Sequence, residues 1–216
     1  MGLTIHYAGS IRKKSFLSAL IDEVRDICEV NKWEYQIYET EFPTNTFGKK
    51  AYNKKVYGIM FSPHDDAEPV HLTFLSNGRM SSEFNLNLFS DAANNPIKEI
   101  PDELFKKLIY QLHTKTQYAG SDTHKIVVHL MKHLEKKYLR NFKLYDEGHY
   151  WETLDEKLLD ENFDTYTKMI NAVTAAFENN KMKEGETIEE FLKRTLGDAL
   201  GNVEIKKVTT GKIPNK

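Results

Sequence analysis

The chain has 216 residues, of which 40% are hydrophobic and 29% are charged, and its formal net charge is −2. This length is ample for a hydrophobic core and fits one large domain or two small ones, while the near-neutral charge gives no overall basic surface for nucleic acid or an acidic membrane. The single cysteine, Cys28, excludes an intramolecular disulfide and a zinc site made of several cysteines.

The first forty residues alternate between two kinds of pattern. Alternating apolar and polar residues predict a strand in LTIHYAG, residues 3–9. Apolar residues at helical spacing predict a helix in SFLSALIDEVRDICEV, residues 15–30, in which Cys28 packs as a small apolar side chain. Alternation returns in WEYQIYE, residues 33–39. Residues 3–39 therefore predict a β-α-β unit, whose default form is a parallel strand pair with a right-handed crossover.

The next segment predicts strands and turns. The polar stretch 42–55 predicts a loop. VYGIMFS, residues 56–62, and VHLTFLS, residues 70–76, predict a β-hairpin closed by the polar segment 63–69. NGRM, residues 77–80, is typical of a second turn, after which we expect another strand through SSEFNLNLF, residues 81–89.

The second half of the chain predicts mainly helices. Pro101 suits the first turn of a helix that runs on through apolar residues to a break at Gly120. A second helix follows over 122–138, and NFKLYDEGHY, residues 141–150, predicts a short strand or an extended link. A third helix is indicated by apolar residues spaced four and three apart from Leu159 to Phe177.

Two capping boxes, in which a Thr hydroxyl and a Glu carboxylate bond to each other's backbone amides, predict where helices begin. They are TLDE at Thr153–Glu156 and TIEE at Thr187–Glu190. The combined prediction is one α+β domain over residues 1–200, strand-rich to residue 100 and helical beyond it. Its mixed four- or five-stranded sheet, β-α-β and then a hairpin, is covered by a C-terminal set of about four helices. The tail, 201–216, has no clear pattern, and we expect it to be poorly structured.

The predicted helix over 122–138 carries three histidines. Stepping about 100° per residue with Leu130 at the centre puts Ile126 on the buried stripe. His129 and His133 then share one border of that stripe, and His124 lies on the opposite flank. A pair four residues apart can hold a divalent metal such as zinc, with a third ligand drawn from elsewhere. The candidates for that ligand are Glu147, His149, His113 and His71. The alternative is that both rings pack at the border of the core and hydrate their nitrogens.

The segment YDEGHYWETLDE, residues 145–156, is the densest polar and aromatic cluster in the chain. Functional side chains concentrate on loops, so it predicts a ligand-binding site made of Glu147, His149, Tyr150 and Trp151. The alternative is that Trp151 serves only as a hydrophobic staple beside the helix cap.

Two weaker patterns involve other histidines. The polar segment SPHDDAEPVH, residues 62–71, offers oxygen ligands for a divalent ion but lacks the glycine and spacing of a calcium loop. His6 and His71 occupy the polar faces of two predicted strands, and they would meet if those strands were neighbours. For the polar segment the alternative is an ordinary hairpin tip, and for His6 and His71 it is a partly exposed sheet face.

No nucleophile elbow, phosphate-binding loop or dinucleotide-binding fingerprint is present in the sequence. The N-terminus shows no signal-peptide pattern and no segment has the apolar length of a membrane span, so we expect a cytoplasmic protein. We predict a non-catalytic module without a cofactor that uses the 145–152 loop and the 122–138 helix to bind a protein or small molecule. We expect no nucleic-acid or membrane partner, and leave a homo-oligomer open. The alternative is a metal-dependent hydrolase using His129 and His133 with an acid from the 146–152 loop.

Charge is distributed unevenly along the sequence. Residues 101–140 carry eight bases and four acids, whereas residues 145–190 carry thirteen acids and four bases. The simpler interpretation is two solvated helix faces; the other is that each face recruits a partner of opposite charge.

Overall fold

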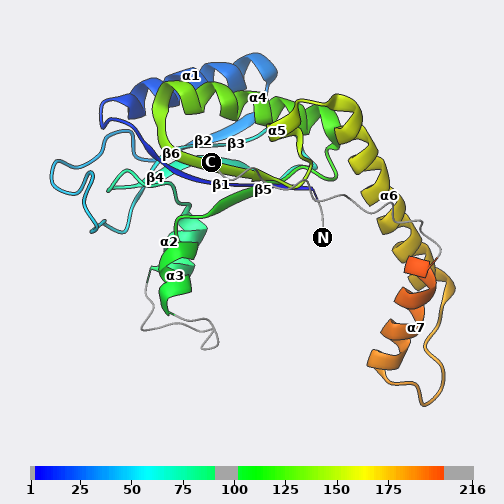
Figure 1. The fold of residues 1–216 in the computed structure, drawn as a ribbon. Helices are drawn as coiled ribbons and strands as arrows, with labels where there is room; N and C mark the ends of the chain where they lie inside the picture. The colour runs from blue at the N-terminus through cyan, green and yellow to red at the C-terminus, as the bar shows by residue number, and fades with distance from the viewer. Residues whose placement is uncertain (1–2, 91–101, 202–216) are drawn as a thin grey trace, which may run out of the picture. The chain divides into compact units, whose positions relative to one another are not determined.

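A computed structural model describes residues 3–90 and 102–201 (Figure 1). The chain divides into two compact units, Met1–Leu159 and Asp160–Lys216, so the single domain expected over 1–200 stays a prediction. Within the described ranges, no helix combines the length and apolar character needed to cross a membrane. Pro101 and the tail beyond residue 201 lie outside the described residues.

Strands and helices are interspersed along the chain up to β6, and helices follow it. The strands are β1 (Thr4–Ile11), β2 (Glu34–Ile37), β3 (Val56–Ser62), β4 (Val70–Leu75), β5 (Leu112–Lys115) and β6 (Leu139–Asp146). The helices are α1 (Phe16–Asn31), α2 (Glu83–Phe89), α3 (Asp102–Leu108), α4 (Gly120–Tyr138), α5 (Tyr150–Thr153), α6 (Glu156–Asn179) and α7 (Ile188–Gly201). The α+β class is thus confirmed.

The strands form two antiparallel sheets of three strands each, ordered β5-β1-β6 and β2-β3-β4. The hairpin β3–β4 is confirmed, with Val56 opposite Leu75. The single mixed sheet and its parallel β1–β2 pair are wrong. Both edges of β1 are occupied by antiparallel partners from the second half of the chain, so β2 pairs with β3 instead.

Two segments change class relative to the prediction. Residues 81–89 were expected to begin a strand, but they contain helix α2, because the Ser82 hydroxyl accepts a hydrogen bond from the Asn85 amide at 3.1 Å and caps the helix. The helix expected to run toward Gly120 ends at Leu108, and β5 follows. In β5, Leu112 and Thr114 are buried while His113 is exposed, which is the alternation of a strand rather than of a helix.

Helices α1 and α4 lie side by side over one face of the strands, and α2 and α3 lie on the other side (Figure 1). Cys28 is buried in α1, as expected. The buried stripe of α4 is rotated from the predicted one: Ile126 is 46% exposed and His124 is 0% exposed. The stripe follows a three-four spacing that is centred away from Leu130. It runs through His124, Val127, Met131, Leu134 and Tyr138.

The long helix α6 is confirmed, but its cap is not the predicted box. The Asp155 carboxylate accepts a hydrogen bond from the Leu158 amide at 3.1 Å, and the Thr153 hydroxyl instead donates to the His149 carbonyl. Asp155 therefore caps α6 because it directly precedes the first helical residue.

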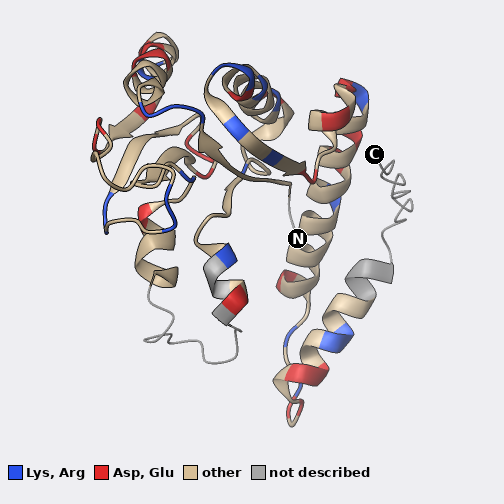
Figure 2. Ribbon diagram, turned by 60° about the vertical axis from the view of Figure 1, so that its left-hand side comes forward, with Lys and Arg blue, Asp and Glu red and all other residues tan. Residues whose placement is uncertain are grey.

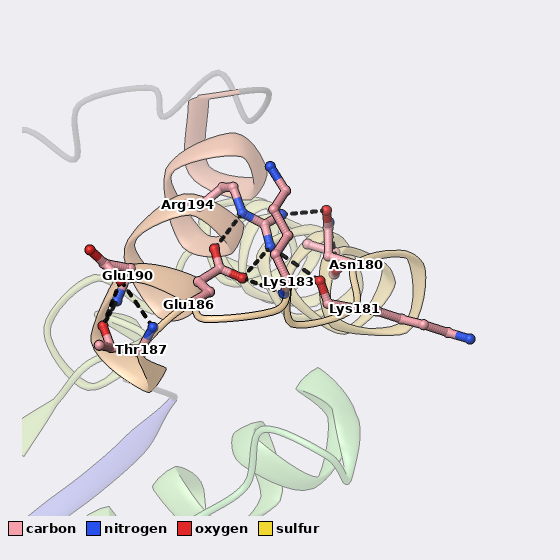
Figure 3. Close-up of polar contacts among 8 residues, drawn as sticks. Asn180, Lys181, Lys183, Glu186, Thr187, Glu190 and Arg194 are labelled. Carbon is pink, nitrogen blue, oxygen red and sulfur yellow. Dashed lines mark hydrogen bonds and ion pairs between the residues drawn. The ribbon is translucent and has the colours of Figure 1, made fainter.

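The second unit, from Asp160 onward, contains most of α6 and all of α7, joined by a turn. The box at Thr187–Glu190 is confirmed: the Thr187 amide donates to the Glu190 carboxylate at 3.0 Å, and the Glu190 amide donates to the Thr187 hydroxyl at 3.3 Å. Behind this cap, the Arg194 guanidinium binds both carboxylate oxygens of Glu186, at 2.9 and 3.0 Å (Figure 3). The turn is therefore closed by a bidentate ion pair.

Figure 2 shows the uneven charge on the fold. Lys and Arg recur along α4, whereas Asp and Glu recur along the first half of α6. Part of the basic charge on α4 is neutralised locally, since the Lys125 ammonium lies 2.8 Å from the Asp122 carboxylate and 3.1 Å from that of Glu156.

Candidate functional site

The 146–153 turn is anchored by a buried hydrogen-bond chain. His124 Nε2 lies 2.9 Å from Asp146 Oδ1, and neither side chain is exposed. On the other side of the ring, His124 Nδ1 lies 2.7 Å from the Thr116 hydroxyl. Because a carboxylate only accepts, the Nε2 proton is donated to Asp146, which fixes the orientation of the ring.

Asp146 also organises the backbone that follows it. Its carboxylate accepts hydrogen bonds from the amides of Gly148, at 2.7 Å, and Trp151, at 2.9 Å. Burial by itself raises the pKa of this carboxyl, but the hydrogen bond and charge of His124 and the two amides outweigh it, so the pKa is lowered. The turn therefore folds around an ionised carboxylate.

Tyr150 and Trp151, two of the predicted ligand-binding residues, pack against α4. The Tyr150 side chain is buried, and its hydroxyl lies 3.1 Å from His129 Nε2. The ammonium of Lys132 lies 4.3 Å from the centre of the Trp151 ring and donates to the Trp151 carbonyl at 2.6 Å. These contacts fix the turn to α4.

His129 and His133 do not share a partner. His129 meets Tyr150, whereas His133 Nε2 lies 2.6 Å from a carboxylate oxygen of Glu23 on α1. Burial raises the pKa of Glu23, but hydrogen bonds from Lys137, Tyr138 and His133 lower it to about 2. Within residues 3–90 and 102–201, no group of three His, Cys, Asp or Glu side chains is already arranged to hold a metal. A metal at His129 and His133 stays a prediction.

Glu147 and His149 lie apart from this packing. The backbone of His149 adopts a left-handed conformation, with φ 59°, and its ring is half-buried. Glu147 turns onto β1, where Oε2 accepts a hydrogen bond from the Thr4 amide at 3.0 Å and Oε1 lies 3.4 Å from His6 Nε2. Of the four predicted residues, Glu147 is the one that the contacts of the described chain place beside an exposed histidine of the sheet.

A second carboxylate repeats this arrangement on the neighbouring strand. Glu68 Oε2 accepts a hydrogen bond from the Lys115 amide at 3.0 Å and lies 3.8 Å from His113 Nε2. The two sites correspond through the β1–β5 register, in which Thr4 is opposite Lys115 and His6 is opposite His113. Two strands thus each present an imidazole beside a carboxylate that is fixed by a strand amide.

A third ring extends the row. Tyr145 on β6 is opposite His6, and its ring centre lies 6.0 Å from that of His6, while the His6 and His113 centres lie 6.2 Å apart. The three rings are exposed by about half: 47% for His6, and 58% for both His113 and Tyr145. We call this surface the sheet face. It consists of His6, Glu68, His113, Tyr145 and Glu147.

His71 does not join His6, because β1 and β4 belong to different sheets. Burial, and then the charge of His113, lowers the pKa of His71 to about 4. Within the segment 62–71, the His64 ring accepts a hydrogen bond from the Asp66 amide at 3.0 Å in a local turn, so Glu68 is the member of that segment that reaches the sheet face.

Comparison of the chain with protein-family models, curated proteins and solved structures gives no match. The function is therefore considered from the site alone. The prediction from sequence did not identify Thr116, His124 and Asp146 as a unit. The signal for His124 was its three-four spacing with Val127 and Met131; no local signal marks Asp146 as its partner.

Proposed function

We propose that the protein is a non-catalytic binding module whose protein or small-molecule ligand contacts the sheet face. The observation that carries this proposal is the repeated pairing of an exposed imidazole with an anchored carboxylate, His6 with Glu147 and His113 with Glu68. Exposed side chains that are held in place lose little conformational freedom when a ligand binds.

The buried chain beneath the turn supports the same proposal. A buried polar pair of this kind contributes little net stability by comparison with apolar packing, so its benefit here is geometric. Asp146 fixes the turn that begins with Glu147, and Tyr150 and Trp151 fix it to α4. In this proposal α4 supports the turn from behind, and the ligand lies on the opposite side of the sheet.

The chemistry of the sheet face indicates what the ligand presents. Glu68 and Glu147 are hydrogen-bond acceptors with negative charge, and each has one carboxylate oxygen held by a backbone amide. Cations and hydrogen-bond donors are the complement of such a surface. The alternative of a hydrolase at His129 and His133 has weaker support, because those rings bond to Tyr150 and to Glu23 separately.

The test is a thermal-shift screen of the full chain with a panel of amines, amino acids and short basic peptides. We expect hits that raise the melting temperature of the wild type and lose their effect in Glu147→Gln. Glu152→Gln is the matched control, since Glu152 is an exposed carboxylate of the same turn. A panel without hits, or hits that are indifferent to Glu147→Gln and Glu68→Gln, would count against the proposal.

A further inference from the structure

We propose that His6 and His113 bind one divalent transition-metal ion between them, with Glu147 as a third ligand. This inference deepens the proposed function, on which it rests, by naming a ligand class for the sheet face. Imidazole together with carboxylate suits zinc, cobalt and nickel.

The first support is the kind of strand pair that the two histidines form. The amide and carbonyl of Thr4 both form hydrogen bonds with Glu147, and those of Lys115 both form hydrogen bonds with Glu68. The backbone polar groups of these two opposed residues therefore point away from each other. This orientation repeats every second residue along a strand, so His6 and His113 also form a non-hydrogen-bonded pair. Side chains approach each other most closely at such pairs, where the Cα atoms are about 4.5 Å apart.

The second support is the distance between the rings. A zinc–nitrogen bond is about 2.0–2.1 Å, so the centre of an imidazole lies about 3.2 Å from an ion that it holds, and two rings on one tetrahedral ion have centres about 5.2 Å apart. The observed separation of 6.2 Å is about 1 Å longer than this spacing. The two exposed rings of His6 and His113 therefore have to rotate toward each other by a small amount to share an ion.

The third support is the available carboxylate. Glu147 Oε1 lies 3.4 Å from His6 Nε2 while its other oxygen is held by the Thr4 amide, and such an outer hydrogen bond orients a ligating group. The three side chains do not yet converge within the described chain, so binding requires rotation of the exposed rings.

The experiment uses the untagged full chain, stripped with a chelator and then titrated with Co²⁺ and Zn²⁺ alone. Visible absorption of Co²⁺ and calorimetry with Zn²⁺ report binding. We expect one ion per chain, with affinity about tenfold weaker or worse in both His6→Ala and His113→Ala. His133→Ala is the matched control: His133 is also exposed beside a carboxylate, at 2.6 Å from Glu23, and we expect its affinity to be unchanged.

Wild-type affinity in His6→Ala or in His113→Ala would overturn the inference, as would an equal loss in His133→Ala. Melting curves of the stripped variants in chelator check that each is folded. If metal binding fails while an organic ligand still responds to Glu147→Gln, only this inference fails. If metal binds and the panel gives no other ligand, only the organic-ligand part of the proposed function fails.

Discussion

His124 and Asp146 form a polar pair that is closed to water and joins the buried side of α4 to the end of β6. Their atoms Nε2 and Oδ1 lie 2.9 Å apart, and both side chains are fully buried. Separating such partners leaves a polar group without water or hydrogen bonds, which costs much more than the intact pair contributes. The pair therefore determines whether the turn that carries Glu147 keeps its shape.

Asp146→Ala tests this dependence. We expect the free energy of unfolding at pH 7, measured with urea, to fall by about 3 kcal/mol, because His124 and the amides of Gly148 and Trp151 all lose their acceptor. Asp66→Ala is the control, since Asp66 is exposed and lies 3.8 Å from His64; we expect a change within about 0.5 kcal/mol. A loss below about 1 kcal/mol in Asp146→Ala would contradict the role of the pair.

The side chain of His71 is expected to make the free energy of unfolding depend on pH. Its pKa is lowered from 6.5 to about 4 by burial and by the charge of His113. Between these values the unfolded chain binds a proton that the folded chain does not, so the free energy of unfolding falls as the pH is lowered through this window. The slope is about 1.4 kcal/mol per pH unit, which gives at most about 3 kcal/mol over the window.

The measurement is urea unfolding of the wild type and of His71→Gln from pH 7 to pH 4. The backbone bonds of His71 to the Tyr7 hydroxyl do not involve its side chain, so the substitution can leave them intact. Other histidines contribute to both curves, and the difference between the curves isolates His71. Parallel curves would show that His71 takes up its proton equally readily in the folded and the unfolded chain.

The contact between Arg194 and Glu186 is expected to stabilise the turn between α6 and α7. The pKa of Glu186 is lowered to about 2, chiefly by the bidentate hydrogen bond from Arg194 and next by the hydrogen bond from the Lys183 amide. Arg194→Lys keeps the charge but loses the planar fork. We expect amide hydrogen exchange across residues 180–187 to become about tenfold faster. Lys193→Ala, at the exposed neighbouring position, should leave exchange in this turn unchanged; equal effects of both substitutions would refute a specific role for the fork.

Local patterns determined which parts of the fold could be predicted. The β3–β4 hairpin, helix α6 and the cap at Thr187 depend on residues close together in the chain, and their signals were correct. The pairing of β1 with β5 and β6 joins residues more than a hundred positions apart, and no short-range pattern specifies it. A four-residue strand such as β5 was also hidden inside an apolar run that satisfied helical spacing.

The same distinction applies to the candidate site. Glu147 was found because it lies in a conspicuous polar cluster, but its neighbour His6 is 141 residues away in sequence. His129 and His133 are close in sequence, and spacing alone suggested a shared ligand, whereas the packing of α4 against α1 and against α5 gives them different partners. Sequence spacing can place side chains on a helix face, but it does not identify the element that faces them.

A substitution at Gly148 tests how tightly the turn encloses the pair of His124 and Asp146. A Cβ atom at this position would lie 2.8 Å from Leu159 Cδ1, 3.1 Å from Asp146 Oδ1 and 3.1 Å from His124 Nε2. The leucine methyl can rotate away, but the two polar atoms are held by their mutual bond. Gly148→Ala must therefore displace the turn or lengthen the contact between His124 and Asp146, which we expect to cost about 1–3 kcal/mol of the free energy of unfolding.

Urea unfolding compares this variant with Gly197→Ala, the same chemical change within helix α7. A Cβ at Gly197 has no neighbour within 4 Å, and alanine is the better helix former, so the control should be neutral or slightly stabilising. Gly148→Ala should also weaken the binding of any ligand that depends on Glu147, because the displaced turn moves that carboxylate away from His6. A variant as stable as the wild type would mean that the turn can yield without disturbing His124 and Asp146, and the position of Glu147 would then depend on its contacts with Thr4 and His6.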